Sequence, residues 1–308
     1  MVAIFFGFYG IVFAAGARLK GKRQNWLALA IFLIPALILV MTGLGVPAIQ
    51  TLLESFKSAD ASKWVGFANY KWAFKTPEIR LAFLNTMLWF VITPIIVTSL
   101  GLALATMLNK MKREAIPKSL IFMPMAISFV GGSLIWNMMY QYEEPNMPQR
   151  GLVGQVMKWL GIPLQHLILW SPWNNLFLMA VYVWGFTGFA MVILSAAIKG
   201  VPADIVEASA LDGAHGWRLF RNITFPMVKG TFIVVLATGV VGALKVFDIV
   251  RTMTGGNFST NVLANEMYSQ TFVQFDQGKG SALAVVLFLL VPPILIYNIR
   301  SLKKERTH

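Results

Sequence analysis

The sequence has 308 residues, of which 57% are hydrophobic and only 13% are charged. Charged residues make up about a quarter of ordinary soluble domains, so this composition excludes a single water-soluble core and predicts an integral membrane protein. The chain contains no cysteine, which excludes disulfides, thiolate metal sites and a cysteine nucleophile. Its three histidines, His166, His215 and His308, have no metal-ligand spacing, and we expect no metal site.

Six apolar runs reach the length of about 20 residues that a membrane-spanning helix needs. These runs are residues 26–49, 81–108, 119–140, 174–198, 230–250 and 281–299. In a seventh, shorter run at residues 2–17, the basic residues follow the apolar part, whereas a signal peptide carries them in front. We predict an all-α polytopic membrane protein with about seven transmembrane helices. Residues 1–25 form a short N-terminal span and basic loop, residues 26–308 form a six-helix core, and Pro94 and Pro124 mark expected kinks.

Lysine and arginine are concentrated in alternate segments between these runs. The segments at residues 17–25, 109–118, 199–229 and 300–308 together carry +11 of the chain's net charge of +13. The positive-inside rule therefore assigns them to the cytoplasm, with the C-terminus inside and the N-terminus outside. The segments at residues 54–80, 141–173 and 252–280 then face outward. This distribution favours membrane lipid over nucleic acid as the partner of the basic residues.

The sequence lacks the motifs of ATP hydrolysis and of covalent catalysis. The nearest match to a phosphate-binding loop, residues 16–22, is followed by Arg23 where a magnesium-binding hydroxyl is required. We therefore expect no enzymatic activity, no catalytic residue and no cofactor in this chain. If ATP drives the protein, ATP and Mg²⁺ must be bound by a separate ATPase chain.

The long polar segment at residues 199–228 separates two of the apolar runs. Pro202 is suited to the start of a helix, and Gly213 to a left-handed cap at its end. Trp217 and Phe220 then belong to a second short helix, which Pro226 separates from the next span. Two short helices of this kind either dock into a cleft of a partner or lie on the bilayer surface.

The same segment resembles the EAA signature of permease subunits from binding-protein-dependent ABC importers. The matching residues are Glu207, Ala208, Ser209, Asp212, Gly213, Ala214, Phe220, Ile223 and Pro226. Two positions depart from the signature, since Ser209 replaces the second alanine and Phe225 replaces a leucine. The resemblance implies that residues 207–213 form the coupling helix that contacts the ATPase subunit.

Other segments are similar to the carbohydrate branch of this family. They are residues 65–70, 84–86, 247–248, 254–256 and 278–282. The resemblance is strongest to the first of two permeases in an alpha-glucoside or maltose-type importer, with trehalose as another possible substrate. It implies a bacterial inner-membrane location, a second permease, a dimer of cytoplasmic ATPase subunits and an external sugar-binding protein.

A sugar site needs hydrogen-bonding side chains for the hydroxyl groups and aromatic faces for the ring. The candidates for the substrate path are Asn137, Tyr140, Gln141, Tyr182, Trp184, Lys245, Phe247 and Asp248. Lys245 and Asp248 are three residues apart on one helix face, so they either line the path or form a structural ion pair. The same two residues would serve the alternative function, an ion-coupled secondary transporter that works without an ATPase.

Overall fold

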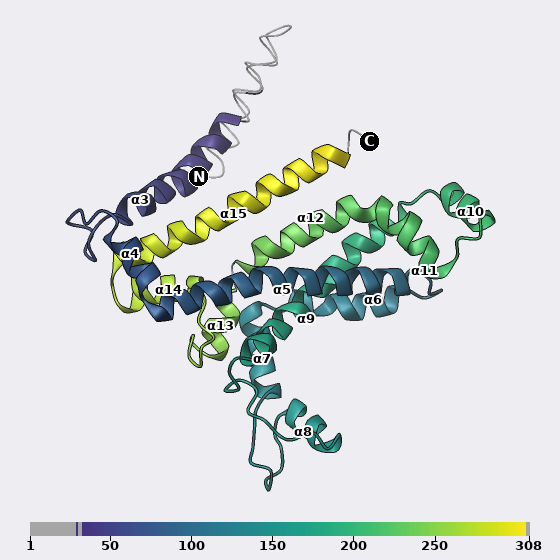
Figure 1. Cartoon of the computed structure of the whole chain (residues 1–308), viewed down its shortest axis with the longest axis horizontal. Helices are drawn as coiled ribbons and strands as arrows, with labels where there is room; N and C mark the ends of the chain where they lie inside the picture. Colours follow the sequence, from purple (N-terminus) through teal and green to yellow (C-terminus); the bar gives the residue numbers. More distant parts are fainter. Residues whose placement is uncertain (1–28, 30–32, 245, 306–308) are drawn as a thin grey trace, which may run out of the picture.

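The computed structural model describes residues 29, 33–244 and 246–305, and the regular secondary structure within these residues is helical (Figure 1). One isolated bridge between Lys57 and Trp64 is the only β-type pairing in this part of the chain. The predicted all-α class is therefore confirmed. The span predicted at residues 2–17 and the basic loop after it lie outside the described residues.

Four helical stretches in the described part of the chain are long and apolar enough to cross a membrane, and a bent pair of helices would make a fifth. The four stretches are Leu33–Glu54, Pro77–Leu108, Asn174–Lys199 and Gly216–Ala243. Each overlaps one of the predicted runs. A shorter apolar helix, Gln277–Leu290, overlaps the start of the last predicted run. The chain is thus a polytopic helical membrane protein.

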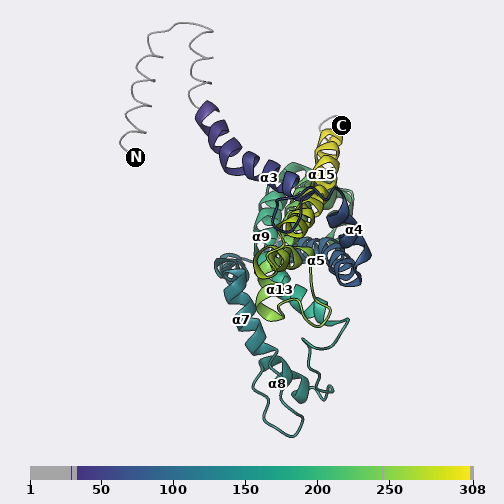
Figure 2. The same ribbon diagram turned by 90° about the vertical axis from the view of Figure 1, so that its left-hand side faces the viewer.

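The long helices form a bundle, and the short elements lie at its ends and on one side. α5, α9, α12 and α15 run alongside one another, with α10 and α11 at one end and α4 and α14 at the other (Figure 1). α7 and α8 project from the side of the bundle (Figures 1 and 2). In chain order, the elements are η1 (Met41–Gly45), α3 (Val46–Glu54), α4 (Ala68–Lys75), α5 (Pro77–Leu108), α6 (Ala115–Phe122), η2 (Met123–Ala126), α7 (Phe129–Met139), α8 (Leu152–Trp159), α9 (Asn174–Lys199), α10 (Ala203–Leu211), α11 (Gly216–Leu219), η3 (Phe220–Thr224), α12 (Phe225–Ala243), α13 (Phe247–Met253), α14 (Leu263–Tyr268), η4 (Ser269–Val273) and α15 (Gln277–Glu305).

The run predicted as one span at residues 119–140 is broken in the structure. Ala115–Ala126 and Phe129–Met139 meet at an angle of 102°. Pro124 lies in the 3₁₀ turn before the break, and a proline cannot donate the backbone hydrogen bond that continues a helix. Ser128 then starts the new helix, because its side chain accepts a hydrogen bond of 3.1 Å from the Gly131 amide. The kink expected at Pro124 is therefore present, and it divides the run into two helices.

The run predicted at residues 230–250 also ends earlier than expected. The helix stops at Ala243, and α13 begins separately at Phe247. Leu244 and Val246, on either side of the break, are both buried in the core of the bundle. Hydropathy did not locate this break because the two residues beside it, Leu244 and Val246, are both apolar.

The core lies between α5, α9, α12 and α13. Its largest fully buried side chains include Trp89, Tyr182 and Met191. α5 and α9 approach each other closely at Gly101, where an added Cβ would lie 2.9 Å from the backbone nitrogen of Met191. Small residues at such crossings let two membrane helices pack backbone to backbone. The close contact makes α5 and α9 the rigid centre of the bundle.

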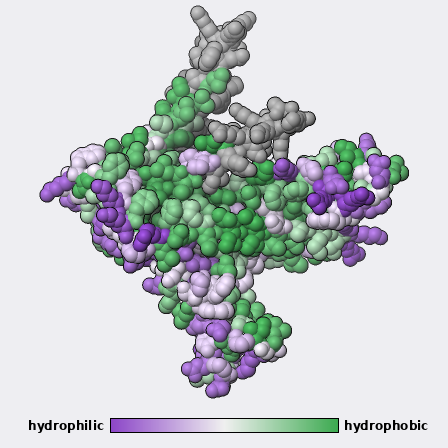
Figure 3. Space-filling view, in the orientation of Figure 1, coloured by the Kyte–Doolittle hydropathy of each residue, from purple (hydrophilic) through white to green (hydrophobic). Residues whose placement is uncertain are grey.

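The surface of the bundle is divided along its length. Hydrophilic residues gather at its two ends and on the projecting arm, and apolar residues cover the surface between them (Figure 3). The stretch Leu33–Glu54 has none of its apolar window buried. Lipid or another membrane helix is the natural neighbour of such a surface, because exposed apolar side chains are costly in water.

Candidate coupling loop and substrate path

The loop between α9 and α12 carries a short helix whose two ends are fixed by local backbone chemistry. Pro202 caps the start of α10. Gly213 follows its end with a φ of 78°, a left-handed conformation that strains residues with a side chain. The amide of Gly213 donates to the carbonyl of Ala210 (3.0 Å), and that of Ala214 to the carbonyl of Ser209 (2.9 Å), which are the paired bonds of a Schellman cap. The predicted helix and its left-handed cap are confirmed.

One face of α10 is open to the surroundings. Leu211, the last residue of α10, is 90% exposed, although leucine is one of the residue types most often buried in proteins. Ser209 is the exception, since it is buried and its hydroxyl donates to the carbonyl of Val206 (2.8 Å). The hydroxyl of Ser209 therefore has a hydrogen-bond partner at this buried position. The remaining residues of the resemblance in this stretch are exposed or half-buried: Glu207, Ala208, Asp212, Gly213 and Ala214.

The segment after α10 does not form a separate short helix, and this prediction was wrong. One helix runs from Gly216 to Ala243 and includes Pro226. A π turn at Phe220–Thr224 precedes the proline, and the Phe225 amide bonds to the Phe220 carbonyl five residues earlier. The π turn absorbs the irregularity at Pro226, so the proline does not end the helix. Trp217 stacks on Phe220 with 5.2 Å between ring centroids, and it is 71% exposed.

Charged residues connect the base of this loop to the neighbouring helices. Glu114, just before α6, accepts hydrogen bonds from Lys118 (2.7 Å) and from Lys199, the last residue of α9. These bonds, the one from Lys118 first and the one from Lys199 second, hold the pKa of the Glu114 carboxyl below its usual value. The carboxylate is thus favoured at neutral pH.

Neutral amide side chains connect the loops at the opposite end of the bundle. Asn85 in α5 donates through its Nδ2 to the carbonyls of Ser259 (2.8 Å) and Asn261 (2.9 Å). Asn174, at the start of α9, donates to the carbonyl of Phe258 (2.7 Å). Both asparagines are buried, so the loop between α13 and α14 is held to the bundle by bonds shielded from water.

The two tyrosines predicted for the substrate path are packed inside the protein. Tyr140 donates its hydroxyl to the carbonyl of Phe177 (3.0 Å). Tyr182 donates to the carbonyl of Gly239 (3.2 Å), and its ring stacks on Phe129 at 5.4 Å between centroids. Both side chains are buried. These contacts stabilise the bundle, and a role in contacting substrate stays a prediction.

The other candidates of this region leave polar or aromatic surface open. Asn137 is half-buried near the end of α7, and Gln141 just beyond it is exposed. Trp184 of α9 is half-buried and meets Trp136 edge to face at 5.9 Å between ring centroids. The amide of Asn137 and the indole rings of Trp136 and Trp184 thus belong to the junction of α7 and α9. Gln141 is not part of the contact between the rings.

Phe247 and Asp248 line a cavity of about 520 Å³ between α13, α14 and α15. Phe247 packs at 5.0 Å between ring centroids against Tyr268, which also lines the cavity, and Arg251 lies 4.9 Å from the centroid of the Tyr268 ring. Lys245 lies outside the described residues, so its pairing with Asp248 stays a prediction. The other residues that line the cavity are Leu244, Ala264, Met267, Leu287 and Phe288.

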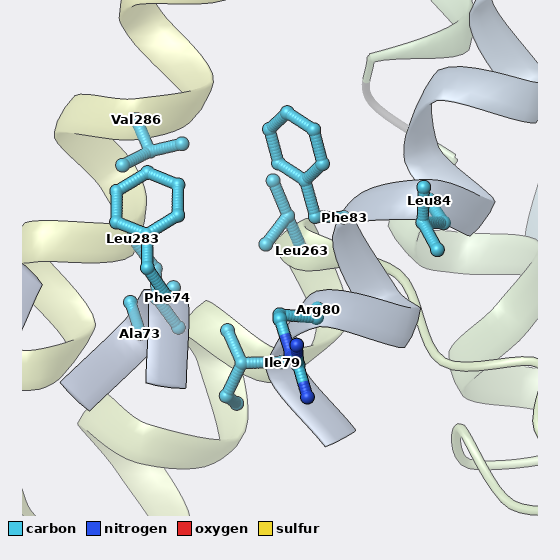
Figure 4. Close-up of a pocket in the computed structure, with 9 residues that line it drawn as sticks. All are labelled: Ala73, Phe74, Ile79, Arg80, Phe83, Leu84, Leu263, Leu283 and Val286. Atoms are coloured by element: carbon cyan, nitrogen blue, oxygen red, sulfur yellow. The ribbon is translucent and has the colours of Figure 1, made fainter. Parts of the chain in front are cut away.

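A second, smaller cavity of about 260 Å³ lies between α4, α5, α14 and α15 (Figure 4). Arg80 is the one polar side chain among the nine residues that line it. A sugar needs several hydrogen-bonding partners, so this cavity is poorly suited to hold one. The remaining lining residues are Ala73, Phe74, Ile79, Phe83, Leu84, Leu263, Leu283 and Val286.

Nearly the whole sequence matches one family of transport proteins. Residues 4–302 fit the family described as "Binding-protein-dependent transport system inner membrane component". The chain belongs to this family. The family to which the sequence resemblance pointed is therefore confirmed, and the coupling role of residues 207–213 stays a prediction.

Named members of the family are similar over most of their length. The osmoprotective compounds uptake permease protein of Synechocystis sp. is 43% identical over 274 residues, which cover 89% of this chain and 98% of that protein. The alpha-glucoside transport system permease protein of Rhizobium meliloti is 41% identical over 300 residues, covering 97% and 88%.

Two solved structures share the fold of this chain. A chain of a bacterial ABC transporter that imports the acidic polysaccharide alginate superposes with a TM-score of 0.79 at 20% identity, covering 92% of this chain and 96% of that chain. A chain of a bacterial alginate ABC transporter in complex with an alginate pentasaccharide-bound periplasmic protein gives 0.78 at 19%, covering 90% and 93%. At this identity, the comparison establishes the fold of this family member and no finer property.

Sequence reasoning missed what the asparagines of this family member do. Asn85 belongs to a segment that shows the resemblance, but no role followed from the sequence alone, and Asn174 and Asn261 were not singled out. Their bonds join residues more than 80 positions apart, such as Asn174 and Phe258. The available signal was the presence of asparagines inside or next to apolar runs, where an unpaired amide is costly.

Proposed function

We propose that this chain is one of two permease subunits of an ATP-driven ABC importer that carries a sugar into the cytoplasm. The observation that carries the proposal is α10, a capped helix at one end of the bundle on which Glu207, Ala208 and Leu211 are exposed. An exposed apolar side chain held on a rigid helix is suited to dock into a groove of another protein. The partner is a dimer of ATPase subunits, which would hold ATP and Mg²⁺.

The proposed substrate is an alpha-glucoside or a related oligosaccharide such as maltose or trehalose. The 41% identical relative from Rhizobium meliloti is named for alpha-glucoside transport, and this supports the substrate class. The junction at Asn137, Trp136 and Trp184 supplies an amide and indole rings, the groups that bind sugar hydroxyls and ring faces. The cavity at Phe247 and Asp248 offers a second stretch of the path.

The proposed orientation places α10 and the C-terminus in the cytoplasm and the α14 end outside. The basic segments support it, because those at residues 109–118 and 199–229 flank the same end of the bundle. An external sugar-binding protein would then deliver its cargo to the α14 end. The exposed apolar stretch Leu33–Glu54 is available to the second permease or to lipid.

The proposed mechanism couples two equilibria, and none of this chain's residues performs catalysis. ATP binding closes the ATPase dimer, and α10 moves with it. The bundle then changes the side to which the substrate path opens. Nucleotide shifts this equilibrium only because the ATPase dimer binds it more tightly in one state than in the other.

Reconstitution into proteoliposomes tests the proposal. We expect uptake of a radiolabelled alpha-glucoside only when this chain, the second permease, the ATPase dimer, the binding protein and ATP are all present. Omission of the ATPase should abolish uptake. Uptake by this chain alone, driven by a proton or sodium gradient, would contradict the proposal and establish the ion-coupled alternative.

A further inference from the structure

Three helices are tied together by polar bonds at the end of the bundle that carries α10. The ammonium group of Lys118 lies 2.6 Å from Asn109 Oδ1, 2.6 Å from Ser195 Oγ and 2.7 Å from Glu114 Oε2. An ammonium group has three donors, so each of them has a partner. Asn109 caps the end of α5, Glu114 caps the start of α6, and Ser195 lies near the end of α9. We refer to these four residues as the Lys118 cluster.

The Lys118 cluster is closed by further bonds among its own members. Ser195 donates its hydroxyl to Asn109 Oδ1 (2.6 Å), and Asn109 donates to the backbone carbonyl of Ser195 (3.3 Å). The Lys118 side chain is only 16% exposed and that of Glu114 is 26% exposed. Charge-assisted bonds that are this well shielded are stronger and more directional than surface ion pairs. The ends of α5, α6 and α9 are therefore fixed relative to one another.

A short, bonded linker joins this cluster to α10. Lys199, which also bonds Glu114, is the last residue of α9, and only three residues separate it from the start of α10 at Ala203. The amide of Gly200 donates to the carbonyl of Ala196 (3.0 Å), and that of Val201 to the carbonyl of Ile198 (3.2 Å). Because the linker continues the bonding of α9, the direction of α10 follows the end of α9.

We propose that Lys118 is a positioning residue for energy coupling, because its cluster makes the three helix ends and the stem of α10 move as one body. The inference rests on the proposed function, in which α10 docks on an ATPase. Without Lys118, a displacement of α10 would be absorbed by separation of the helix ends and would reach the substrate path only in part.

The test measures sugar uptake per ATP hydrolysed in proteoliposomes that contain the complete transporter. Lys118→Met keeps the aliphatic stem and removes the three donors, and we expect the ratio of uptake to hydrolysis to fall about tenfold. Lys118→Arg keeps the donors and should restore most of the ratio. Lys110→Met, at an exposed lysine of the same basic segment, is the matched control and should leave the ratio unchanged.

An unchanged ratio in a Lys118→Met transporter that still retains the ATPase would overturn the inference. If that variant does not assemble, a second experiment uses the absence of cysteine from the chain. The variant Asn109→Cys/Ser195→Cys removes two members of the Lys118 cluster, so its uptake per ATP should be reduced. A short thiol cross-linker between the two cysteines should restore full uptake per ATP, because the inference requires the ends of α5 and α9 to stay together throughout the cycle. Loss of uptake on cross-linking would overturn it. A wild-type chain that needs no ATPase would contradict the proposed function instead.

Discussion

Two loops of this protein contain glycine motifs that resemble the family pattern, and the structure uses them in opposite ways. The loop that carries α10 is mostly exposed, and its cap at Gly213 presents a short helix outward. The loop between α13 and α14 is held inward by Asn85 and Asn174, and Thr260 within it is fully buried. A recurring glycine therefore indicates a constrained backbone, but the surrounding bonds decide whether the loop docks on a partner or supports the bundle.

The two ends of the bundle also differ in the chemistry that holds them. The α10 end relies on charged residues, with Lys118 and Glu114 at its centre. At the α14 end, the loop between α13 and α14 is held to α5 and α9 by neutral amides that bond backbone carbonyls, as Asn85 does. Charged bonds respond to pH and salt, whereas buried amide bonds do so much less. The comparison leads to four predictions, ordered from the largest expected effect.

Asn85→Leu should produce the largest loss of stability. The substitution keeps the branching of the side chain at Cγ but leaves the carbonyls of Ser259 and Asn261 without their donor. We expect the free energy of unfolding to fall by about 2–3 kcal/mol. Thermal unfolding in detergent, followed by tryptophan fluorescence, measures the change. Gln141→Leu, at an exposed position, serves as the control. Equal thermal unfolding midpoints for the two variants would show that the bonds of Asn85 do not stabilise the protein.

Gly213→Val should reduce transport strongly while leaving the bundle stable. A β-branched side chain at φ 78° costs about 1–2 kcal/mol, which would displace the cap of α10. Sugar uptake should fall about tenfold for a cost of this size, whereas the thermal midpoint should stay near that of the wild type because α10 is exposed. Normal uptake in this variant would argue against α10 as the coupling element.

Leu211→Ala should weaken binding of the ATPase with no effect on folding. Leu211 is 90% exposed, so its removal leaves no cavity in the isolated chain. Partial burial of its side chain in a partner groove would contribute about 1 kcal/mol, and the loss should raise the Kd of the ATPase dimer about fivefold. Titration in detergent measures this Kd. A Kd equal to that of the wild type would exclude Leu211 from the contact.

Lowering the pH should affect the α10 end first, with the smallest change of the four. The pKa of Glu114 lies below its ordinary value of 4.5, so the stability from its bonds is present above pH 4.5 and is lost as the pH falls through the folded-state pKa. In the Glu114→Gln variant, the thermal unfolding midpoint should no longer fall with pH in the range where the Glu114 carboxylate is protonated. An identical pH profile for variant and wild type would show that the bonds to Lys118 and Lys199 do not contribute.

The sequence predicted the apolar runs and the α10 cap because both depend on local properties. Hydropathy locates residues 81–108 and 174–198 within a few residues of α5 and α9. Gly213 was identified because an end-of-helix glycine has a specific backbone role. In both cases the information lies within a few turns of the chain.

The breaks and the polar contacts could not be predicted in the same way. The end of α12 at Ala243 depends on how Leu244 and Val246 pack, and Asn85 bonds partners 174 and 176 positions away. Pro124 and Pro226 look alike in the sequence, but the chain turns sharply after the first and continues as a helix through the second. The tertiary surroundings decide between these outcomes.

The π turn at Phe220–Thr224 also preserves an angular phase. A π turn contains one residue more than an α-helical turn, and each residue advances an α-helix by about 100°. Because the wider turn takes up its extra residue within one turn, Trp217 faces nearly the direction that it would face in a regular α-helix one residue shorter. The turn before Pro226 therefore accommodates an added residue without redirecting Trp217.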